Sequence, residues 1–460
     1  MQNIKTLEIP GCMPQVSANL PIMIKKKLAI ISTYDELCGI AGYTKALVPV
    51  FKDDFDITVF DLDQFIFKHQ SQSVQKLAEK EINRICSELR NFDCVNIQLE
   101  HGTFGNDSKI IFRRIKKIIQ NSHTICITFH TIMPSDGLDI FDILKKCAAQ
   151  GLREAINAYK SHKRATILGD GIYNLLKNEQ RKRDLSVIVH TRRDRRMLQI
   201  VHGIKYVYDH PLAYFTPNKV TEIYKTSDRS KFTQLKGLPD DAILLGCFGF
   251  ISSYKGIDTA IKALSLLPKN YHLAIFGGVH PAAIKKNQLI DPFIASLLGE
   301  IAPGKTWLDF TSVGAERMNI NVSGADLISF SDKKNPRDMS SRVHFMGALS
   351  DDDFPVAMAI CDTVLLPYVE VGQSSSGPMS TAVDLRKHVI AARTKAFMQY
   401  ARYHKDRFNM FDIGNYLQLM QLILADSRKT PAPYPPPEIN ALTNMQTYLK
   451  ALFQKIKDES

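Results

Sequence analysis

Residues 362–392 read DTVLLPYVEVGQSSSGPMSTAVDLRKHVIAA, and this stretch decides the fold. It begins as a buried strand (362–368), passes through a polar loop, continues as a helix that opens at Pro378, and ends in a strand (388–392). Proline is favoured at the first helical position, and Ser375–Gly377 stand where capping residues belong. A helix N-terminus behind a parallel strand presents free N–H groups and a favourable dipole to an anion. The stretch therefore predicts an anion site, which we interpret as the place of a nucleotide diphosphate.

The composition is that of a globular protein with a basic surface. The chain has 460 residues, which predicts two or three domains rather than one core. Hydrophobic residues make up 45% and charged residues 23%, as in ordinary soluble proteins. The net charge of +12 favours an anionic partner, which could be a nucleotide, a phospholipid surface or a nucleic acid. Charge alone does not choose among these.

The cysteines and the hydropathy pattern predict a cytoplasmic protein. Eight cysteines are scattered without a CxxC pair, and several lie inside apolar strand patterns, as reduced buried thiols do. No apolar run reaches the ~18 residues of a membrane-spanning helix. The first residues lack the basic, apolar and cleavage regions of a signal peptide.

Short apolar runs alternate with helical patterns along most of the chain. The expected strands are Lys27–Thr33, Ile57–Leu62, Phe92–Leu99, Thr124–His130, Ser186–Thr191, Ala242–Phe250, His272–Gly277, Val343–Met346, Val364–Tyr368 and His388–Ala392. This alternation predicts an α/β protein with two Rossmann-like, doubly wound parallel-sheet domains facing each other across a cleft. The predicted parts are an N-terminal arm (1–24), a first domain (25–215), a linker (216–240), a second domain (241–425) with an insertion (285–340), and a Pro-rich linker with a C-terminal helix (426–460).

Ligands of open α/β sheets bind at the carboxyl ends of strands, and several polar residues stand there. Gly39, after the first strand, would let the backbone approach a phosphate, although a plain strand-to-helix turn also explains it. His130 ends its strand and could donate to a sugar hydroxyl or a leaving phosphate, although a lone histidine is more often structural. Glu100 and His101 occupy the corresponding place after the preceding strand and are further polar candidates.

Lys255 follows the first strand of the second domain by a short loop. A lysine at this place can reach a β-phosphate as a point charge. A solvated lysine at a helix start is the alternative. Because a cation is unfavourable at a helix N-terminus, that alternative is weakened and a functional role is favoured.

Motifs for metal and Walker-type chemistry are missing. The sequence has no GxxxxGK[ST], HExxH, paired CxxC or clustered histidines, so neither a metal nor a resident cofactor is expected. Asp61-Leu-Asp63 resembles a metal-binding DxD, but a solvated strand end is the simpler reading. The basic stretch 112–119 has its cations at helical spacing and could lie on an anionic membrane, with a solvated helix face slightly favoured.

Seven segments, taken in order, resemble the retaining, nucleotide-sugar-dependent glycosyltransferases of the GT-B fold (the group 1 family). They are CGIAGYT at 38–44, QLEHGTFG at 98–105, ITFHT at 127–131, GFISSYKGIDTAIKAL at 249–264, HLAIFGG at 272–278, VHFMGALSDDDF at 343–354 and LLPYVEVGQSSSGPMSTAV at 365–383. The resemblance implies that a sugar moves from a nucleoside-diphosphate-sugar, a co-substrate rather than a cofactor, to a hydroxyl acceptor with retained anomeric configuration.

The resemblance also implies a role for each matching residue. Gly39 matches the glycine loop beside the donor diphosphate, His130 the histidine near the transferred sugar, and Lys255 the phosphate-binding lysine. Glu100 joins His130 and Lys255 as a catalytic candidate. The remaining donor-side candidates are Gly277, Gly347 near the base, the phosphate-loop residues Ser375, Ser376 and Gly377, and Glu370 as a substitute ribose or sugar contact.

The chain departs from the family pattern at the donor site. Phe250 stands where an arginine often precedes the lysine by five residues. The family's two glutamates, eight residues apart, fall on Ser374 and Ala382, and its glycine before the next strand falls on Arg386. Sub-branches with a Ser-Ser-Gly loop share the first glutamate replacement, so activity is still expected.

Three functions are open on these grounds. The favoured one is a metal-independent glycosyltransferase of surface polysaccharide or glycoconjugate synthesis, with a glycan, glycolipid or other hydroxyl acceptor, cytoplasmic and in peripheral contact with the inner membrane face. The second is a non-catalytic, glycosyltransferase-like partner subunit, motivated by the missing glutamates. A nucleic-acid-binding protein ranks last, because the basic stretches lack an RNA-binding motif or interleaved aromatic residues.

Overall fold

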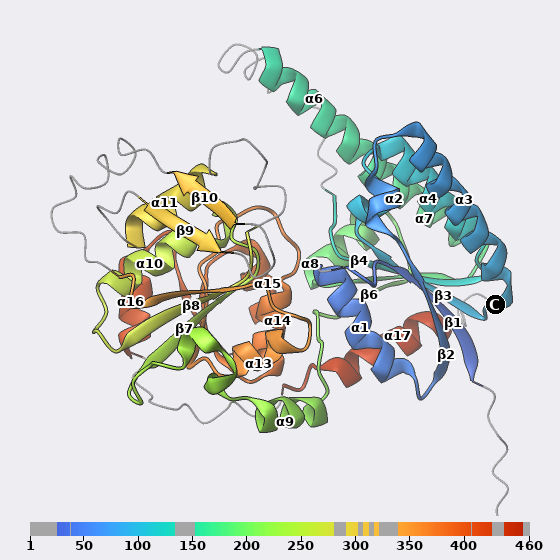
Figure 1. Ribbon diagram of the computed structural model, residues 1–460. Helices are drawn as coiled ribbons and strands as arrows, with labels where there is room; N and C mark the ends of the chain where they lie inside the picture. The colour runs from blue at the N-terminus through green and yellow to red at the C-terminus, as the bar shows by residue number, and fades with distance from the viewer. Residues whose placement is uncertain are drawn as a thin grey trace, which may run out of the picture.

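The computed structural model describes residues 25–36, 38–133, 152–279, 291–301, 307–311, 317–321, 339–405, 407–425 and 437–453. Two α/β domains stand side by side, the N-terminal one in blue to green on the right of Figure 1 and the C-terminal one in yellow to orange on the left. Each is built on a parallel sheet of six strands, which confirms the predicted fold class. The predicted N-terminal arm and the Pro-rich segment lie outside the described residues.

The N-terminal sheet has the order β2-β1-β3-β4-β5-β6. Its strands are β1 Lys26–Ser32, β2 Phe55–Asp61, β3 Cys94–Leu99, β4 Thr124–Phe129, β5 Leu185–Val189 and β6 Val207–Asp209. Its helices are α1 Gly39–Phe51, α2 Gln64–Lys68, α3 Gln72–Glu88, α4 Ser108–Gln120, α6 Leu152–Thr166, α7 Ile172–Glu179 and α8 Arg192–Arg196, with single turns at Leu89–Asn91, His101–Phe104, Ile167–Gly171 and Met197–Val201. Every residue of β3 and β5 is buried, as expected of strands covered on both faces.

The C-terminal sheet has the order β11-β8-β7-β12-β13-β14. Its strands are β7 Ile243–Phe248, β8 Tyr271–Phe276, β11 Val343–Gly347, β12 Thr363–Leu366, β13 His388–Ala392 and β14 Phe408–Phe411. Its helices are α9 Pro217–Thr226, α10 Ile257–Ser265, α11 Pro292–Ile301, α13 Asp353–Ala359, α14 Gly377–Asp384, α15 Lys395–Ala401 and α16 Tyr416–Ala425, with turns at Arg229–Lys231, Thr233–Leu235 and Ser253–Lys255. Separate apolar clusters fill the two faces of this sheet.

The last described helix, α17 (Ala441–Phe453), returns to the N-terminal domain. In Figure 1 it lies in red among the blue elements, and it packs with α1 in the same apolar cluster. The hydroxyl of Tyr448, which is fully buried there, forms a hydrogen bond of 2.8 Å with Thr128 Oγ1. The chain therefore crosses between the domains twice, once near residue 214 and once after α16.

Two predicted segments contain more structure than the sequence indicates. Residues 216–240, expected as a linker, include α9, whose Val220 and Ile223 pack into the C-terminal core. The described part of the 285–340 insertion contains α11 and an antiparallel hairpin of β9 (Trp307–Thr311) and β10 (Arg317–Asn321).

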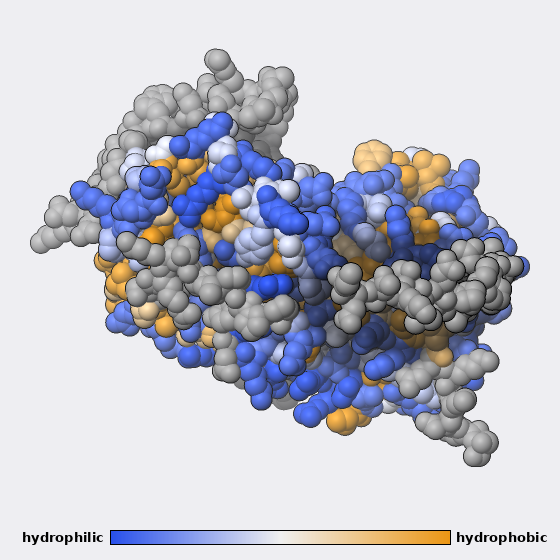
Figure 2. Space-filling model, turned by 90° about the horizontal axis from the view of Figure 1, so that it is seen from below, coloured by the Kyte–Doolittle hydropathy of each residue, from blue (hydrophilic) through white to orange (hydrophobic). Residues whose placement is uncertain are grey.

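The face seen from below in Figure 2 is mostly hydrophilic, with separate apolar patches on both halves. Among the residues that the structure describes, no helix has the length and apolar character to cross a membrane.

Candidate functional site

Lys255 lies beyond the carboxyl end of β7, where the backbone packs closely against the end of the neighbouring strand β12. The turn Ser253–Lys255 ends at Gly256, which is left-handed with φ of 62°. A Cβ on Gly256 would stand 1.9 Å from the carbonyl oxygen of Pro367, so only glycine fits. The close packing fixes Lys255 against the end of β12.

The Lys255 side chain is buried in a pocket of aromatic residues. It is 8% exposed, and its Nζ donates to the hydroxyl of Tyr368 over 2.5 Å. The Nζ also lies 4.1 Å from the ring centroid of Tyr368 and 5.0 Å from that of Tyr254. Among the described residues, no carboxylate forms an ion pair with it. Burial lowers the pKa of Lys255 to about 7.

A buried lysine without a carboxylate is costly unless an anion arrives, and a helix N-terminus stands beside it. Helix α14 begins at Gly377, and the Ser376 Oγ caps it by accepting from Met379 N over 3.4 Å. Tyr368, whose hydroxyl accepts from Lys255, follows β12 and stands in the segment that leads to Ser376. The predicted lysine and the predicted phosphate loop therefore both lie at the carboxyl end of β12.

The N-terminal domain brings a second helix N-terminus toward this loop. The Cys38 Sγ caps α1 by accepting from Ala41 N over 3.4 Å, and the side-chain direction of Gly39 is open. Tyr214 connects the two sides, because its ring centroid lies 5.6 Å from that of Tyr43 on α1. Its hydroxyl lies 3.0 Å from the place of a Cβ on Gly377. Tyr214 thus lies between α1, which begins at Gly39, and Gly377 at the start of α14.

His130 lies behind Tyr43, with ring centroids 5.4 Å apart. It is 6% exposed, and both ring nitrogens are engaged: Nε2 with Gln98 Oε1 at 2.8 Å and Nδ1 with His190 Nε2 at 3.3 Å. Burial lowers its pKa well below the usual value, so the ring is neutral at pH 7. Glu100 is half-buried, and its Oε2 accepts from Thr131 Oγ1 over 2.6 Å, beside the end of the same strand.

The remaining donor-side candidates lie along the carboxyl edge of the C-terminal sheet. Gly277 and Gly347 form a backbone bridge at the ends of β8 and β11, and nothing stands in the side-chain direction of Gly347. Glu370 is exposed, and its two carboxylate oxygens accept from Gly372 N and Lys395 N over 3.0 and 2.7 Å. The Glu370 carboxylate therefore stabilises its own loop and links that loop to the start of α15.

Arg386, which precedes β13 by two residues, has a backbone conformation that favours glycine. Its φ is 58°, the only positive value among the described non-glycine residues. The turn between α14 and β13 thus retains its left-handed shape at the cost of backbone strain.

The sequence reasoning missed the tyrosines and two of the histidines around the site. His190 and His210 directly follow β5 and β6, as His130 follows β4, and the His190 Nδ1 contacts the His210 carbonyl at 3.1 Å. This position after a strand was a usable signal for His190 but not for His210, because β6 is a three-residue edge strand without a continuous apolar run. Tyr214 had none, because it lies in an irregular segment between the domains.

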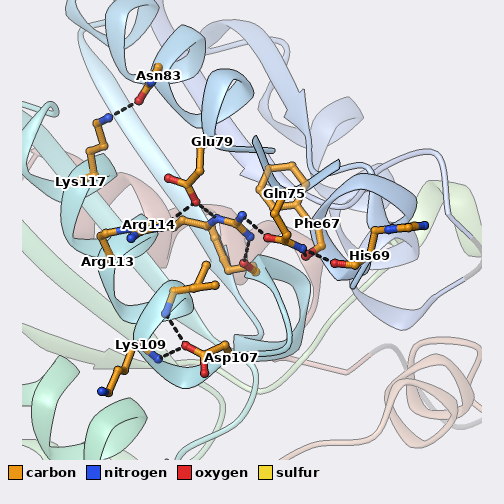
Figure 3. A network of polar contacts seen from close by, with 12 residues as sticks. Phe67, His69, Gln75, Glu79, Asn83, Asp107, Lys109, Arg113, Arg114 and Lys117 are labelled. Carbon is orange, nitrogen blue, oxygen red and sulfur yellow. Dashed lines mark hydrogen bonds and ion pairs between the residues drawn. The ribbon is translucent and has the colours of Figure 1, made fainter. Parts of the chain in front are cut away.

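The structure gives Asp61, Asp63 and the basic stretch structural roles. Asp61 accepts from Tyr34 N, and Asp63 caps α2. On α4 the central cation is turned inward: Arg114 is 1% exposed and lies 2.9 Å from Glu79 Oε1 on α3 (Figure 3). Arg113 reaches the same oxygen over 3.1 Å. The expected single cationic face on α4 is wrong for Arg114, because that side chain joins two helices.

One cavity, of about 180 Å³, lies in the N-terminal domain away from Lys255. It opens at the amino ends of the N-terminal strands, between residues such as Asp93 and Asp184 and the end of α17.

No family model and no curated protein matches this sequence. Among solved structures, it is similar to a sucrose-phosphate synthase from Thermosynechococcus elongatus, with 13% identity, coverage of 94% of this chain and 100% of that one, and a TM-score of 0.56. A UDP-forming trehalose-phosphate synthase from Burkholderia xenovorans is 11% identical, with coverage of 93% of this chain and 98% of that one and a TM-score of 0.56. HepE from Anabaena in complex with UDP-glucose is 14% identical, with coverage of 92% of this chain and 98% of that one and a TM-score of 0.50. The chain therefore has the two-domain GT-B fold that these glycosyltransferases share.

Proposed function

We propose that the protein is a retaining glycosyltransferase, which moves a sugar from a nucleoside-diphosphate-sugar to a hydroxyl acceptor. The observation that carries the proposal is Lys255, a buried lysine that has no carboxylate ion pair among the described residues. Its Nζ donates to Tyr368 at the carboxyl end of β12, the strand that leads to α14. The fold likeness supports it, since the similar HepE structure holds UDP-glucose.

The chemistry asks the protein to stabilise a departing diphosphate. The anomeric C–O bond to the phosphate breaks while the acceptor oxygen bonds to the same face of the sugar, and the acceptor proton passes to the departing phosphate oxygen. The growing charge is met by Lys255, by the backbone N–H groups of residues 375–377 and by the α14 dipole. In this proposal the donors are preorganised and no metal is needed.

The N-terminal domain supplies the acceptor side. His130 and Glu100 lie at the carboxyl ends of adjacent strands, and Gly39 lies at the N-terminus of α1. Neutral His130 can donate a hydrogen bond to a sugar hydroxyl only if it exchanges one of its present partners, so we assign it orientation of the transferred sugar. Gly347 leaves space for the base, Gly277 lets the backbone of Gly249 approach closely beside it, and Glu370 reaches the ribose if its loop turns.

We further propose a role in surface polysaccharide or glycoconjugate synthesis, in the cytoplasm and in peripheral contact with the inner membrane face. The net charge of +12 supports an anionic partner. The non-catalytic subunit and the nucleic-acid-binding protein are not favoured, because neither explains a buried lysine beside a helix N-terminus.

A thermal-shift screen tests the proposal. UDP, GDP, ADP, CMP and their sugar conjugates are added to the protein with EDTA present. A ligand at one hundred times its Kd stabilises the folded state by about 2.7 kcal/mol, which is a readily measured shift. One nucleotide should raise the melting temperature of the wild type but not of Lys255→Met. No shift with any nucleotide would reject the proposal and favour a non-catalytic subunit.

A further inference from the structure

We propose that Gln98 is a positioning residue, which holds the proton of His130 on Nε2 and leaves Nδ1 as an acceptor for a hydroxyl of the transferred sugar. The inference rests on the proposed function and names the atom through which His130 orients the sugar. Gln98 lies on β3, and His130 directly follows the adjacent strand β4. Both side chains are buried.

The orientation of the Gln98 amide is set from a backbone carbonyl. The Cys126 carbonyl oxygen can only accept, and Asn96 Nδ2 donates to it over 3.0 Å. Asn96 Oδ1 is therefore the atom that accepts from Gln98 Nε2, over 2.6 Å. The same Gln98 nitrogen also donates to the hydroxyl of Tyr448 on α17, over 3.1 Å. With its nitrogen used in this way, Gln98 turns its Oε1 to His130 Nε2, at 2.8 Å.

The contacts of His130 and His190 offer three places for protons. Gln98 Oε1 needs a proton on His130 Nε2, and the His210 carbonyl oxygen, at 3.1 Å, needs one on His190 Nδ1. The third place lies between His130 Nδ1 and His190 Nε2, which are 3.3 Å apart. Burial lowers the pKa of both rings below the usual value, so at pH 7 each ring carries one proton. Two protons therefore fill three places.

The contact between the two rings is the one left without a proton. Wherever the empty place falls, two acceptors face each other, and without a shared proton they should lie farther apart than a hydrogen-bonded pair. The separation of 3.3 Å between the rings is the longest of the three, and that of 2.8 Å to Gln98 is the shortest. His130 therefore carries its proton on Nε2, and its Nδ1 is bare.

A bare Nδ1 that faces a second bare nitrogen loses no hydrogen bond when it changes partner. Nε2, in contrast, would have to give up the bond to Gln98. The ring lies at the carboxyl edge of the N-terminal sheet, where Tyr43 of α1 packs edge-on against it with 5.4 Å between centroids. A ligand group that reaches His130 there must donate to Nδ1. A sugar hydroxyl meets this condition, and an ionised phosphate oxygen does not.

Two measurements on the full-length protein at neutral pH test the inference. A nitrogen-15 to proton correlation spectrum of histidine-labelled protein shows which nitrogen of His130 is protonated, once its signal is assigned by its loss in His130→Gln. Isothermal titration with UDP and with UDP-glucose, or with the matching pair if the thermal-shift screen selects another nucleotide, isolates the contribution of the sugar. In the wild type the proton should lie on Nε2. A proton on Nδ1 would overturn the inference.

Gln98→Met keeps a side chain of similar length and removes its oxygen. Two places for protons then remain, so the proton of His130 should move to Nδ1 and be donated to His190 Nε2. The ratio of the affinity for UDP-glucose to that for UDP should fall by roughly fivefold, the effect of one hydrogen bond, while UDP alone binds as to the wild type. A merely structural role would weaken both ligands. A proton that stays on Nε2, or an unchanged ratio, would reject the role of Gln98.

Tyr448→Phe is the matched control. It removes a bond to the same Gln98 nitrogen, but the contact with Asn96 still orients the amide. The proton of His130 and the affinity ratio should therefore stay as in the wild type. A proton on Nδ1 in this variant would show that packing decides its position, and the inference would fall.

Two further outcomes are distinguishable. If Gln98→Met does not fold, the wild-type spectrum decides alone: UDP-glucose, but not UDP, should shift the Nδ1 signal of His130, and an unmoved signal rejects the inference. If the wild type binds no nucleotide of the thermal-shift screen, the proposed function fails, and the inference fails with it. Wild-type binding with the proton on Nδ1 rejects the inference alone.

Discussion

Replacement of Lys255 by methionine should remove function and increase stability at the same time. Methionine fills a similar volume without a charge, and the side chain it replaces is 8% exposed among aromatic rings. A donor that acts on a developing oxyanion contributes about 2.7–4 kcal/mol to transition-state stabilisation. Turnover by Lys255→Met should therefore fall by roughly 100- to 1,000-fold.

The stability gain follows from the lowered pKa of Lys255. Its folded-state pKa of about 7 lies below the unfolded value, so the unfolded chain binds an extra proton throughout the interval between them. Each pKa unit corresponds to 1.36 kcal/mol, so the penalty to folding is on the order of 4 kcal/mol at pH 7 and vanishes as pH rises toward about 10.5. The methionine variant lacks this penalty.

Urea unfolding of both proteins at pH 7 and pH 9.5 measures the effect. The methionine variant should be more stable at pH 7, and the difference should shrink at pH 9.5. Lys387→Met is the control, because Lys387 is half-buried and lies at the amino end of β13, where its Nζ donates to Ala359 O over 3.0 Å. It should leave nucleotide binding intact. A less stable Lys255→Met with normal turnover would refute the reasoning.

Three further predictions follow from the fold. Arg386→Gly should stabilise the protein by about 1 kcal/mol in urea unfolding, because glycine adopts φ of 58° without strain; a destabilised variant would show that the arginine side chain contributes more than its strain costs. Burial lowers the pKa of His190 and of His210 to about 4, so the folded state should lose stability as the pH falls from 6.5 to 4. The expected loss in the free energy of unfolding is about 3 kcal/mol for each histidine. A melting temperature that stays constant over that interval would contradict this prediction. Lys45 and Asp351 pair across the domains at 2.7 Å but are 34% and 42% exposed, so a double-mutant cycle should give under about 1 kcal/mol and less at high salt; a larger, salt-independent coupling would contradict surface screening.

The sequence predicted ten of the strands that form the two parallel sheets, because buried parallel strands read as continuous apolar runs. It missed β6 and β14, which are edge strands of three and four residues without such a run. It also could not place α17. The apolar face of that helix fits either domain, and only the assembled N-terminal sheet shows where it is buried.

The placement of the candidate residues was predictable where it follows from their position after a strand. Lys255, Ser376 and His130 lie at carboxyl ends of strands, as the sequence indicated. Tyr214 and Tyr368 were not predictable as parts of it, since their roles depend on contacts between segments distant in the chain. The left-handed conformation of Arg386 was likewise invisible, because arginine gives no signal for it.

A crystal structure with the nucleoside diphosphate selected by the thermal-shift screen tests the central claim most directly. We predict diphosphate oxygens within hydrogen-bond distance of Lys255 Nζ, of Ser376 Oγ and of backbone N–H groups in residues 375–377. A nucleotide bound elsewhere, or bound with its diphosphate away from Lys255, would contradict it.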